Sequence, residues 1–596
     1  MSSHLKTKYR SHTNGELRVG DVKKRVVLSG WVNTRRDHGG IIFIDLRDKY
    51  GLTQIVFNPE FNKDVFTVGE SLRREDVITI EGEVRARGVG LKNPNLDTGE
   101  IEVFLDKVTL VSKSETPPIE IDDRKPANDD IRLEYRYLDL RRPTMQNNLI
   151  FRDNVIKTAR SFMSNMGCTD IETPLLVKST PEGARDYVVP SRVNPGTFYA
   201  LPQSPQLYKQ MLMIAGCDRY YQIARCLRDE DLRADRQPEH TQIDFEISFV
   251  SQEDIQSMVE GLFVAIFKEN KNITLKTPFQ KFSYEESMGK YGTDKPDIRY
   301  ELFLTEVGDI VKDSDFGVFK DVVSAGGIVK CINPPKDFGR KDIDKYIAFC
   351  QENGAKGMAW MRFSENGLES NIAKYFPDDV KKRLVDAVKP EAGSILMFIA
   401  GKKPMVNAVL DRLRRKLAAD MELYKDDDFK LCWVNDFPLF SYNEDAERWE
   451  PEHHMFSMPK EEFIETMEKN PAPVLGDLWD LAMNGVELAS GSIRISNPSV
   501  QKKIMNIIGM SDEQAEEKFG FLLKAYKYGG PIHGGMGIGL DRVIALMLGH
   551  SDIREVIAFP KNKNAQCPMD GSPGKIDTIQ MKELNIQSTV KEKKKE

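Results

Sequence analysis

The first 110 residues alternate between apolar and polar positions in short runs, a pattern that predicts β-strands. Turn signals such as His38-Gly39-Gly40 and Asp48–Gly51 separate these runs, and Phe61–Gly69 is predicted to be a short helix. Three strands, a helix and two strands is the order of an OB-fold barrel, although a small barrel that binds no nucleic acid would show the same order. The five strand candidates are Arg25–Arg36, Ile41–Arg47, Leu52–Asn58, Val77–Ala86 and Glu100–Val111.

A different pattern follows the barrel. The stretch from Thr116 to Asn128 is acidic and rich in proline, which predicts a hinge. Leu149–Gly167 then has the periodicity of a helix with a glycine stop, and Cys168–Val177 is predicted to be a strand broken by Pro174.

Tyr220–Arg228 and Thr241–Phe249 are predicted to be antiparallel strands joined by a long charged loop. In the second strand Gln242, Asp244 and Glu246 share one face, while the apolar residues between them share the other. The pattern is consistent with the floor of a polar site. An ordinary half-exposed strand would alternate in the same way.

A glycine-rich stretch, Gly529–Gly539, leads into Leu540-Asp541-Arg542 and an apolar helix over Val543–Leu548. Glycines allow a ligand to approach the backbone, and a helix N-terminus favours phosphate, to which Arg542 adds a full charge. The spacing matches neither GxGxxG nor GxxxxGK[ST], which argues against both common nucleotide-binding folds.

Length, composition and charge limit the classes of protein to which the chain can belong. A chain of 596 residues predicts three or more domains, and no apolar run reaches the roughly 18 residues of a membrane span. The net charge of −7 means that any RNA contact must come from local basic patches. Seven scattered cysteines without CxxC spacing disfavour a zinc ribbon, and with a polar N-terminus they predict a cytoplasmic protein.

Several motifs resemble class II aminoacyl-tRNA synthetases. Arg228-Asp229-Glu230 with Arg236-Gln237-Pro238-Glu239 resembles motif 2, and Gly537–Arg542 resembles motif 3. Gly167–Pro174 resembles motif 1, which implies a homodimer. Pro181–Asp186 and Gln203–Lys209 resemble the signatures of the bacterial aspartyl type.

The resemblance implies an α+β multidomain fold: an N-terminal OB-fold β-barrel, an antiparallel-sheet catalytic domain and an inserted α+β domain. The insert carries patterned segments, Ala392–Ile399 and Val406–Ala418, but no catalytic constellation. The expected boundaries are 1–115 for the barrel, 116–145 for the hinge, 146–298 and 429–560 for the catalytic domain, 299–428 for the insert and 561–596 for a C-terminal extension.

The resemblance also implies an aspartate–tRNA ligase that uses ATP and Mg²⁺. Its catalytic residues would be Arg228 and Arg542, and its magnesium ligands Asp480 and Glu487. ATP would be bound by Arg228, Asp229, Glu230, Gln237, His240, Glu487, Gly539, Leu540, Asp541 and Arg542. L-aspartate would be bound by Glu182, Ser204, Gln206, Lys209, Arg228, Asp244, His453, His454 and Arg494.

The barrel would bind the anticodon of tRNA(Asp) through Arg35, Arg36, Phe43 and Gln54, although Phe43 could equally be a core residue. His38 follows Arg35-Arg36-Asp37 and resembles the relaxed type of enzyme, so a second hypothesis is that tRNA(Asn) is charged as well.

Three positions depart from the family pattern. His240 stands where phenylalanine commonly stacks on adenine, Met455 follows the histidine pair where proline is frequent, and Ala489-Ser490 interrupts a glycine-rich turn. The alternatives are asparagine or lysine as substrate, a non-catalytic RNA-binding protein, and an amide synthetase. Lys209 and Arg494 disfavour lysine, the two motif arginines disfavour the RNA-binding protein, and the barrel disfavours the amide synthetase.

Overall fold

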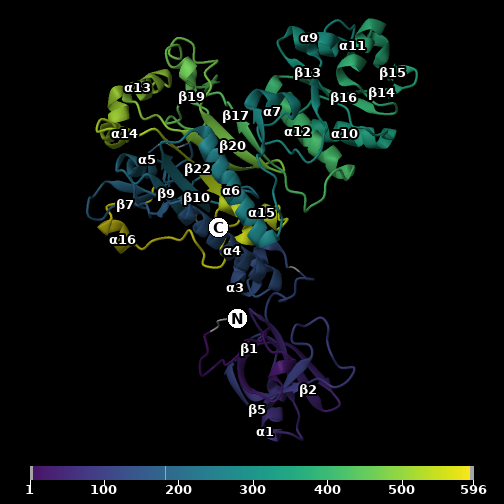
Figure 1. The fold of residues 1–596 in the computed structure, drawn as a ribbon, viewed down its shortest axis with the longest axis vertical. Helices are drawn as coiled ribbons and strands as arrows, with labels where there is room; N and C mark the ends of the chain where they lie inside the picture. The colour runs from purple at the N-terminus through teal and green to yellow at the C-terminus, as the bar shows by residue number, and fades with distance from the viewer. Residues whose placement is uncertain (1–4, 126, 181–182, 591–596) are drawn as a thin grey trace. The chain divides into compact units, whose positions relative to one another are not determined.

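The computed structural model describes residues 5–125, 127–180 and 183–590 (Figure 1). Glu182, one of the predicted aspartate-binding residues, lies outside the described residues. The chain forms two compact units. One consists of Met1–Ile150 with Ala558–Gly574, and the other of Phe151–Ile557 with Lys575–Glu596.

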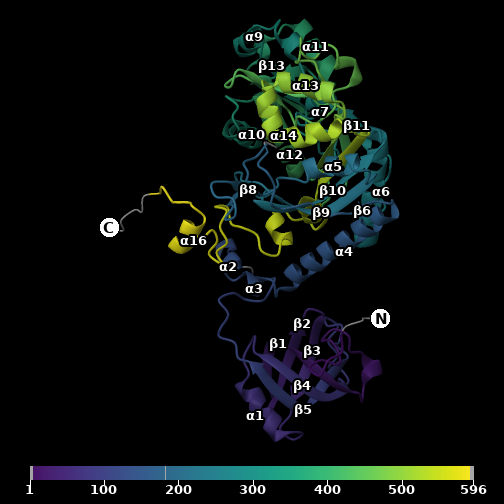
Figure 2. The same ribbon diagram turned by 90° about the vertical axis from the view of Figure 1, so that its left-hand side faces the viewer.

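The first unit contains a closed five-stranded barrel with strand order β1-β2-β3-β5-β4 (Figure 2). The predicted OB-fold is confirmed, and helix α1 (Lys63–Ser71) lies between β3 and β4 as predicted. Alternate apolar residues such as Leu28, Ile44 and Ile80 are fully buried inside the barrel. The strands are β1 (Arg25–His38), β2 (Ile41–Asp48), β3 (Gly51–Phe57), β4 (Val77–Ala86) and β5 (Ile101–Ser112).

The predicted hinge contains two short helices, α2 (Asp129–Glu134) and α3 (Arg136–Asp139). The buried Asp139 carboxylate accepts from Arg136 at 2.7 Å and from Arg142 at 2.8 Å. Arg136 also donates from Nε to the carbonyl of Ala558 at 2.9 Å. The C-terminal segment 558–574 therefore completes this part of the first unit.

An eight-stranded sheet, in the order β11-β17-β20-β21-β22-β10-β9-β6, is the centre of the second unit. It is antiparallel except at its two outermost pairs, β11 with β17 and β6 with β9. The predicted strand Cys168–Val177 is wrong for most of its length, because the strand itself covers Thr169–Asp170, while Val177, beyond the break at Pro174, forms an isolated bridge with Ala200. The strands are β6 (Thr169–Asp170), β9 (Arg219–Leu227), β10 (Glu239–Ser248), β11 (Gln280–Ser283), β17 (Leu431–Asn435), β20 (Leu478–Met483), β21 (Val486–Ile493) and β22 (His533–Gly539).

One face of this sheet is covered by α4 (Pro143–Asn165), α6 (Gln252–Lys271) and α15 (Leu540–Met547). Ile243, Phe245 and Ile247 of β10 pack into this core, as their alternation predicts. The helix predicted over Leu149–Gly167 begins earlier, at Pro143, a residue that suits the first turn of a helix.

The residues predicted to form an insert build a second sheet, in the order β12-β13-β16-β14-β15. Ile395, Met397 and Ile399 of β16 pack with α10 and α12, whereas Leu396 and Phe398 pack on the opposite face with α8, α9 and α11. The elements are β12 (Leu304–Glu306), α8 (Gly308–Val311), α9 (Gly317–Ser324), β13 (Ile328–Ile332), α10 (Arg340–Glu352), β14 (Ala359–Ser364), β15 (Gly367–Glu369), α11 (Asp378–Val388), β16 (Ile395–Gly401) and α12 (Lys403–Asp420).

Shorter elements complete the second unit. They are β7 (Val188–Pro190), β8 (Phe198–Ala200), α5 (Gln206–Ile214), α7 (Tyr284–Lys290), β18 (Phe440–Asn443), β19 (Arg448–Pro451), α13 (Pro498–Ile507), α14 (Asp512–Tyr526) and α16 (Thr578–Glu583). Within the described ranges, no helix is long and apolar enough to cross a membrane.

Candidate active site

A polar cavity of about 450 Å³ lies over the middle strands of the eight-stranded sheet. Gln242 and Asp244 of β10 line it, so the predicted polar floor is confirmed. The neighbouring strand β22 presents glycines here, with Gly537 opposite Asp244 and Gly535 opposite Glu246. A Cβ at Gly535 would lie 2.1 Å from Oε2 of Glu246, so glycine is what leaves room for that carboxylate.

Most of the predicted ATP, aspartate and metal residues meet in this one cavity, although they come from distant parts of the chain. Leu540 and Asp229 do not line it: Leu540 is fully buried in the core, and the backbone N–H of Asp229 donates to the carbonyl of Arg185. The predicted residues that line it are Ser204, Gln206, Lys209, Arg228, Glu230, Gln237, His240, Asp244, His453, His454, Asp480, Glu487, Arg494, Gly539, Asp541 and Arg542.

The carboxylate of Asp541 already has two protein partners. It accepts from the backbone N–H of Thr241 at 2.8 Å and forms an ion pair with Arg152. Asp541 therefore joins the start of α15 to β10.

Arg228 and Arg542 share the cavity. Arg542 donates to the carbonyl of Glu487 at 3.1 Å and to Asp235 at 3.2 Å. The buried Nε of Arg228 has no hydrogen-bond partner among the described residues. Because buried donors are normally paired, this guanidinium is suited to an anionic ligand.

His240 lies close to this pair of arginines. Burial, with smaller contributions from the charges of Arg228, Arg542 and Arg225, lowers the pKa of His240 to about 3. The imidazole is therefore neutral at physiological pH, and a neutral ring can stack on a base.

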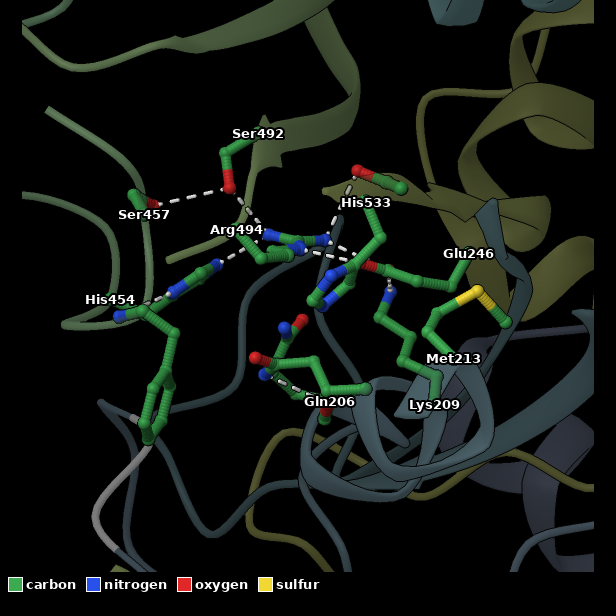
Figure 3. A network of polar contacts seen from close by, with 12 residues as sticks. Gln206, Lys209, Met213, Glu246, His454, Ser457, Ser492, Arg494 and His533 are labelled. Carbon is green, nitrogen blue, oxygen red and sulfur yellow. Dashed lines mark hydrogen bonds and ion pairs between the residues drawn. The ribbon is translucent and has the colours of Figure 1, made fainter. Parts of the chain in front are cut away.

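At another part of the cavity, two buried cations enclose buried carboxylates (Figure 3). Lys209 lies 2.9 Å from Asp244 and 3.3 Å from Glu246, and Arg494 donates to Glu246 over 2.9 and 3.3 Å. Burial by itself raises the pKa of Glu246, but Arg494 and Lys209 outweigh it and hold that pKa below its ordinary value. Glu246 was not among the predicted site residues, although the alternation of β10 placed it on the polar face.

Each of the three guanidinium nitrogens of Arg494 donates to a protein acceptor. Besides Glu246, Nη1 donates to Ser492 at 2.6 Å and lies 2.8 Å from Nε2 of His454, and Nη2 donates to the carbonyl of Gly535 at 3.1 Å. His454 and Ser492 line the cavity.

Asp480 and Glu487 form the candidate metal site. The buried Oδ1 of Asp480 has no hydrogen-bond partner among the described residues, and Nε2 of His453 lies 3.4 Å from it. Burial and the charge of Asp480 raise the pKa of Glu487. The described residues contain no cluster of three metal-binding side chains, but Mg²⁺ needs only one or two carboxylates with phosphate and water. The pair fits that requirement.

In the barrel, the predicted anticodon residues divide between two faces. Arg36 pairs across the strands with Phe43 and contacts Gln54 at 3.1 Å, so these three side chains share one face. Arg35 points to the opposite face and donates to the carbonyl of Gly69 at 3.3 Å. His38 is exposed at the end of β1.

Comparisons with known proteins agree with this geometry. Residues 128–563 match the family "tRNA synthetases class II (D, K and N)", and residues 26–111 match "OB-fold nucleic acid binding domain". The chain is 48% identical to the aspartate–tRNA ligase of Listeria monocytogenes, over 97% of this chain and 98% of that protein. It is also 48% identical to the aspartate–tRNA(Asp/Asn) ligase of Desulfatibacillum aliphaticivorans, over 98% and 99%.

Solved structures show the same fold at low identity. The chain is 19% identical to a putative aspartyl-tRNA synthetase from Leishmania major, with a TM-score of 0.58 over 94% of this chain and 96% of that one. Asparaginyl-tRNA synthetase from Pyrococcus horikoshii, complexed with asparaginyl-adenylate, is 19% identical with a TM-score of 0.56 over 91% and 96%.

Proposed function

Because the chain belongs to the class II tRNA synthetases of the D, K and N family, we propose that it is an aspartate–tRNA ligase. It would join the α-carboxylate of L-aspartate to the α-phosphorus of ATP and release pyrophosphate. A ribose hydroxyl at the 3′ end of tRNA would then attack the aspartyl carbonyl and release AMP.

One observation supports this proposal above the others: a single cavity holds the arginines of two motifs and a separate pair of buried cations. Arg228 and Arg542 suit a triphosphate, whereas Lys209 and Arg494 suit the second carboxylate of aspartate. Asparagine would place a neutral amide against buried cations, which is how such a site rejects it.

The chemistry requires positioned cations rather than a protein nucleophile, since an in-line displacement at phosphorus gathers negative charge. Arg228 would hold the α-carboxylate against the α-phosphate, because a guanidinium can bind two oxygens at once. Arg542 would neutralise the departing pyrophosphate, and neutral His240 would lie against the adenine.

Asp480 and Glu487 would hold Mg²⁺, which supplies charge neutralisation at the phosphates when bound. The orphaned Oδ1 of Asp480 supports this assignment. Ser204, Gln206 and Asp244 would contact or orient the substrate amino group.

Exchange of labelled pyrophosphate into ATP, measured with aspartate, asparagine and lysine in turn, tests the proposal. We expect stimulation by aspartate alone. Stimulation by asparagine and not aspartate would contradict it.

A second candidate is an enzyme that also charges tRNA(Asn). His38 is exposed in the barrel unit, and relatives at 47–48% identity carry the name aspartate–tRNA(Asp/Asn) ligase. Charging assays with tRNA(Asp) and tRNA(Asn) separate the two, and no aspartate on tRNA(Asn) would exclude the second. The proposal includes a homodimer through the motif 1 region and a cytoplasmic location.

A further inference from the structure

A linking segment, residues 291–303, runs from the end of α7 to the inserted sheet and reaches the active-site cavity. Asp294 lines the cavity, and Nζ of Lys295 lies 3.8 Å from Oε2 of Glu487. On the other side, Nη1 of Arg542 lies 3.9 Å from Oε1 of Glu487. Glu487 thus stands between a cation of motif 3 and a cation of the linking segment.

Arg415, on helix α12 of the insert, holds two backbone segments near Glu487. Its guanidinium donates to the carbonyl of Gly485 at 2.8 Å and to the carbonyl of Lys295 at 3.3 Å. Asp411, one turn earlier on the helix, fixes the guanidinium by accepting from its Nε at 2.9 and 3.1 Å. One side chain therefore connects the turn before Glu487 to the segment that carries Lys295.

The turn between β20 and β21 leaves space for the guanidinium of Arg415. Gly485 has φ +82°, a conformation that favours glycine, and a Cβ there would lie 2.5 Å from Nη1 of Arg415, so a larger residue would displace the guanidinium. Asn484 fixes the same turn by donating to the carbonyl of Asp428 and accepting from the N–H of Lys430, each at 2.9 Å.

The neighbouring residue on α12 holds the far end of the linking segment. Arg414 is fully buried and donates to the carbonyls of Leu302 at 2.7 Å and Tyr300 at 2.8 Å. Its guanidinium carbon lies 4.2 Å from the centroid of the Tyr300 ring. Two consecutive arginines of the insert therefore hold the linking segment at Lys295, Tyr300 and Leu302.

We propose that Arg415 is a positioning residue for the ATP–magnesium end of the active site, and that Lys295 is a further cation for the pyrophosphate part of ATP. The insert, whose role the sequence left open, would act through Arg415 to hold Lys295 and Glu487 at a fixed separation before ATP binds. Preorganised charges of this kind avoid a reorganisation cost when the phosphates arrive. The inference rests on the proposed function, because it assigns ATP to this cavity.

The test compares Arg415→Met and Lys295→Met with the wild-type protein. Binding of ATP with magnesium is measured by calorimetry, and KM for ATP and for aspartate by pyrophosphate exchange. We expect each variant to weaken ATP binding about tenfold, the size typical of lost support around a metal site, and to change KM for aspartate by less than about twofold. Arg415→Lys, which can keep one of the two carbonyl contacts, should lie between Arg415→Met and wild type.

Lys416→Met is the matched control. Lys416 is the next residue on the same helix, but its Nζ pairs with Asp420 at 2.6 Å and is half-exposed. It should bind ATP as wild type does. Lys295 is 43% exposed, so Lys295→Met tests the idea even if Arg415→Met does not fold.

Unchanged ATP binding in Lys295→Met would overturn the role of Lys295, and unchanged ATP binding in a folded Arg415→Met would overturn that of Arg415. An equal loss of affinity for ATP and aspartate would also overturn the positioning role. If the wild-type protein shows no aspartate-dependent exchange, the proposed function fails, while the calorimetric comparison still decides the inference.

Discussion

Nη1 of Arg494 donates toward Nε2 of His454 across 2.8 Å. The backbone N–H of Phe456 points at the other ring nitrogen of His454, Nδ1, at 3.2 Å. A neutral imidazole can accept at only one nitrogen, because the other carries its proton. Burial and the Arg494 charge keep the pKa of His454 well below its ordinary value, so the ring is neutral and one of these contacts is unsatisfied.

This relationship predicts unequal effects of two substitutions. Arg494→Lys loses the guanidinium that makes two hydrogen bonds to Glu246, and it should lower kcat/KM for aspartate at least about 100-fold. His454→Ala removes only one of the several partners of Arg494 and should change KM for aspartate less than about threefold. Steady-state pyrophosphate exchange measures both, and equal losses would contradict the ranking.

Glu246→Gln should destabilise the protein strongly. The change keeps the shape but removes the negative charge between Lys209 and Arg494, which leaves two buried cations without their shared partner. Breaking a buried ion pair in this way costs about 3–5 kcal/mol. The control is Asp153→Asn, an exposed partner of Lys157 on α4, for which less than about 1 kcal/mol is expected. Thermal unfolding compares them, and a similar Tm for both variants would count against this role of Glu246.

Gly535→Ala should destabilise the protein because there is no room for the added methyl group. The added Cβ would meet Oε2 of Glu246 at 2.1 Å and the carbonyl of Phe245 at 2.2 Å, so the loss should exceed about 2 kcal/mol. Gly289→Ala in helix α7 is the control, since nothing lies within 4 Å of its Cβ and alanine favours a helix by about 0.5–1 kcal/mol. A Gly535→Ala protein as stable as Gly289→Ala would refute the close fit between β22 and β10.

His240 makes folding sensitive to acid. Its folded-state pKa of about 3 lies below the value of about 6.5 for an exposed imidazole. As the pH falls from about 6.5 towards 3, the unfolded chain binds a proton that the folded chain does not, so stability is lost across that window. The Tm of the His240→Phe variant should therefore fall less between pH 7.5 and pH 5 than the Tm of the wild-type protein. Parallel losses in the two proteins would rule out His240 as a source of the acid sensitivity.

The sequence predicted those parts of the molecule that depend on local pattern. The five barrel strands and the polar face of β10 follow from alternation, and the structure confirms both. The strand after α4 was predicted too long, because strand pairing is decided by a neighbour: Thr169 and Asp170 pair with β9, and the last backbone bond to it is from the N–H of Ile171 to the carbonyl of Tyr221.

From the sequence, residues of the site could be predicted only where they belong to a recognisable motif. Lys295 and Glu487 are 192 residues apart, as their numbers show, and neither Lys295 nor Arg415 stands in a motif whose chemistry the sequence reveals. Their relationship depends on α12 packing against the turn at Gly485, which is a property of the folded chain. Glu246 had a signal in the alternation of β10, but its role depends on two cations from other elements.

The bond from Arg136 to the carbonyl of Ala558 has a consequence for biosynthesis. A ribosome makes the barrel first, yet the segment that completes the same unit, Ala558–Gly574, is made more than 400 residues later. Until almost all of the second unit has been synthesised, α2 and α3 therefore exist without the segment 558–574 that completes their unit. The unit whose synthesis begins first is in this way completed only after Phe151–Ile557 of the other unit has been made.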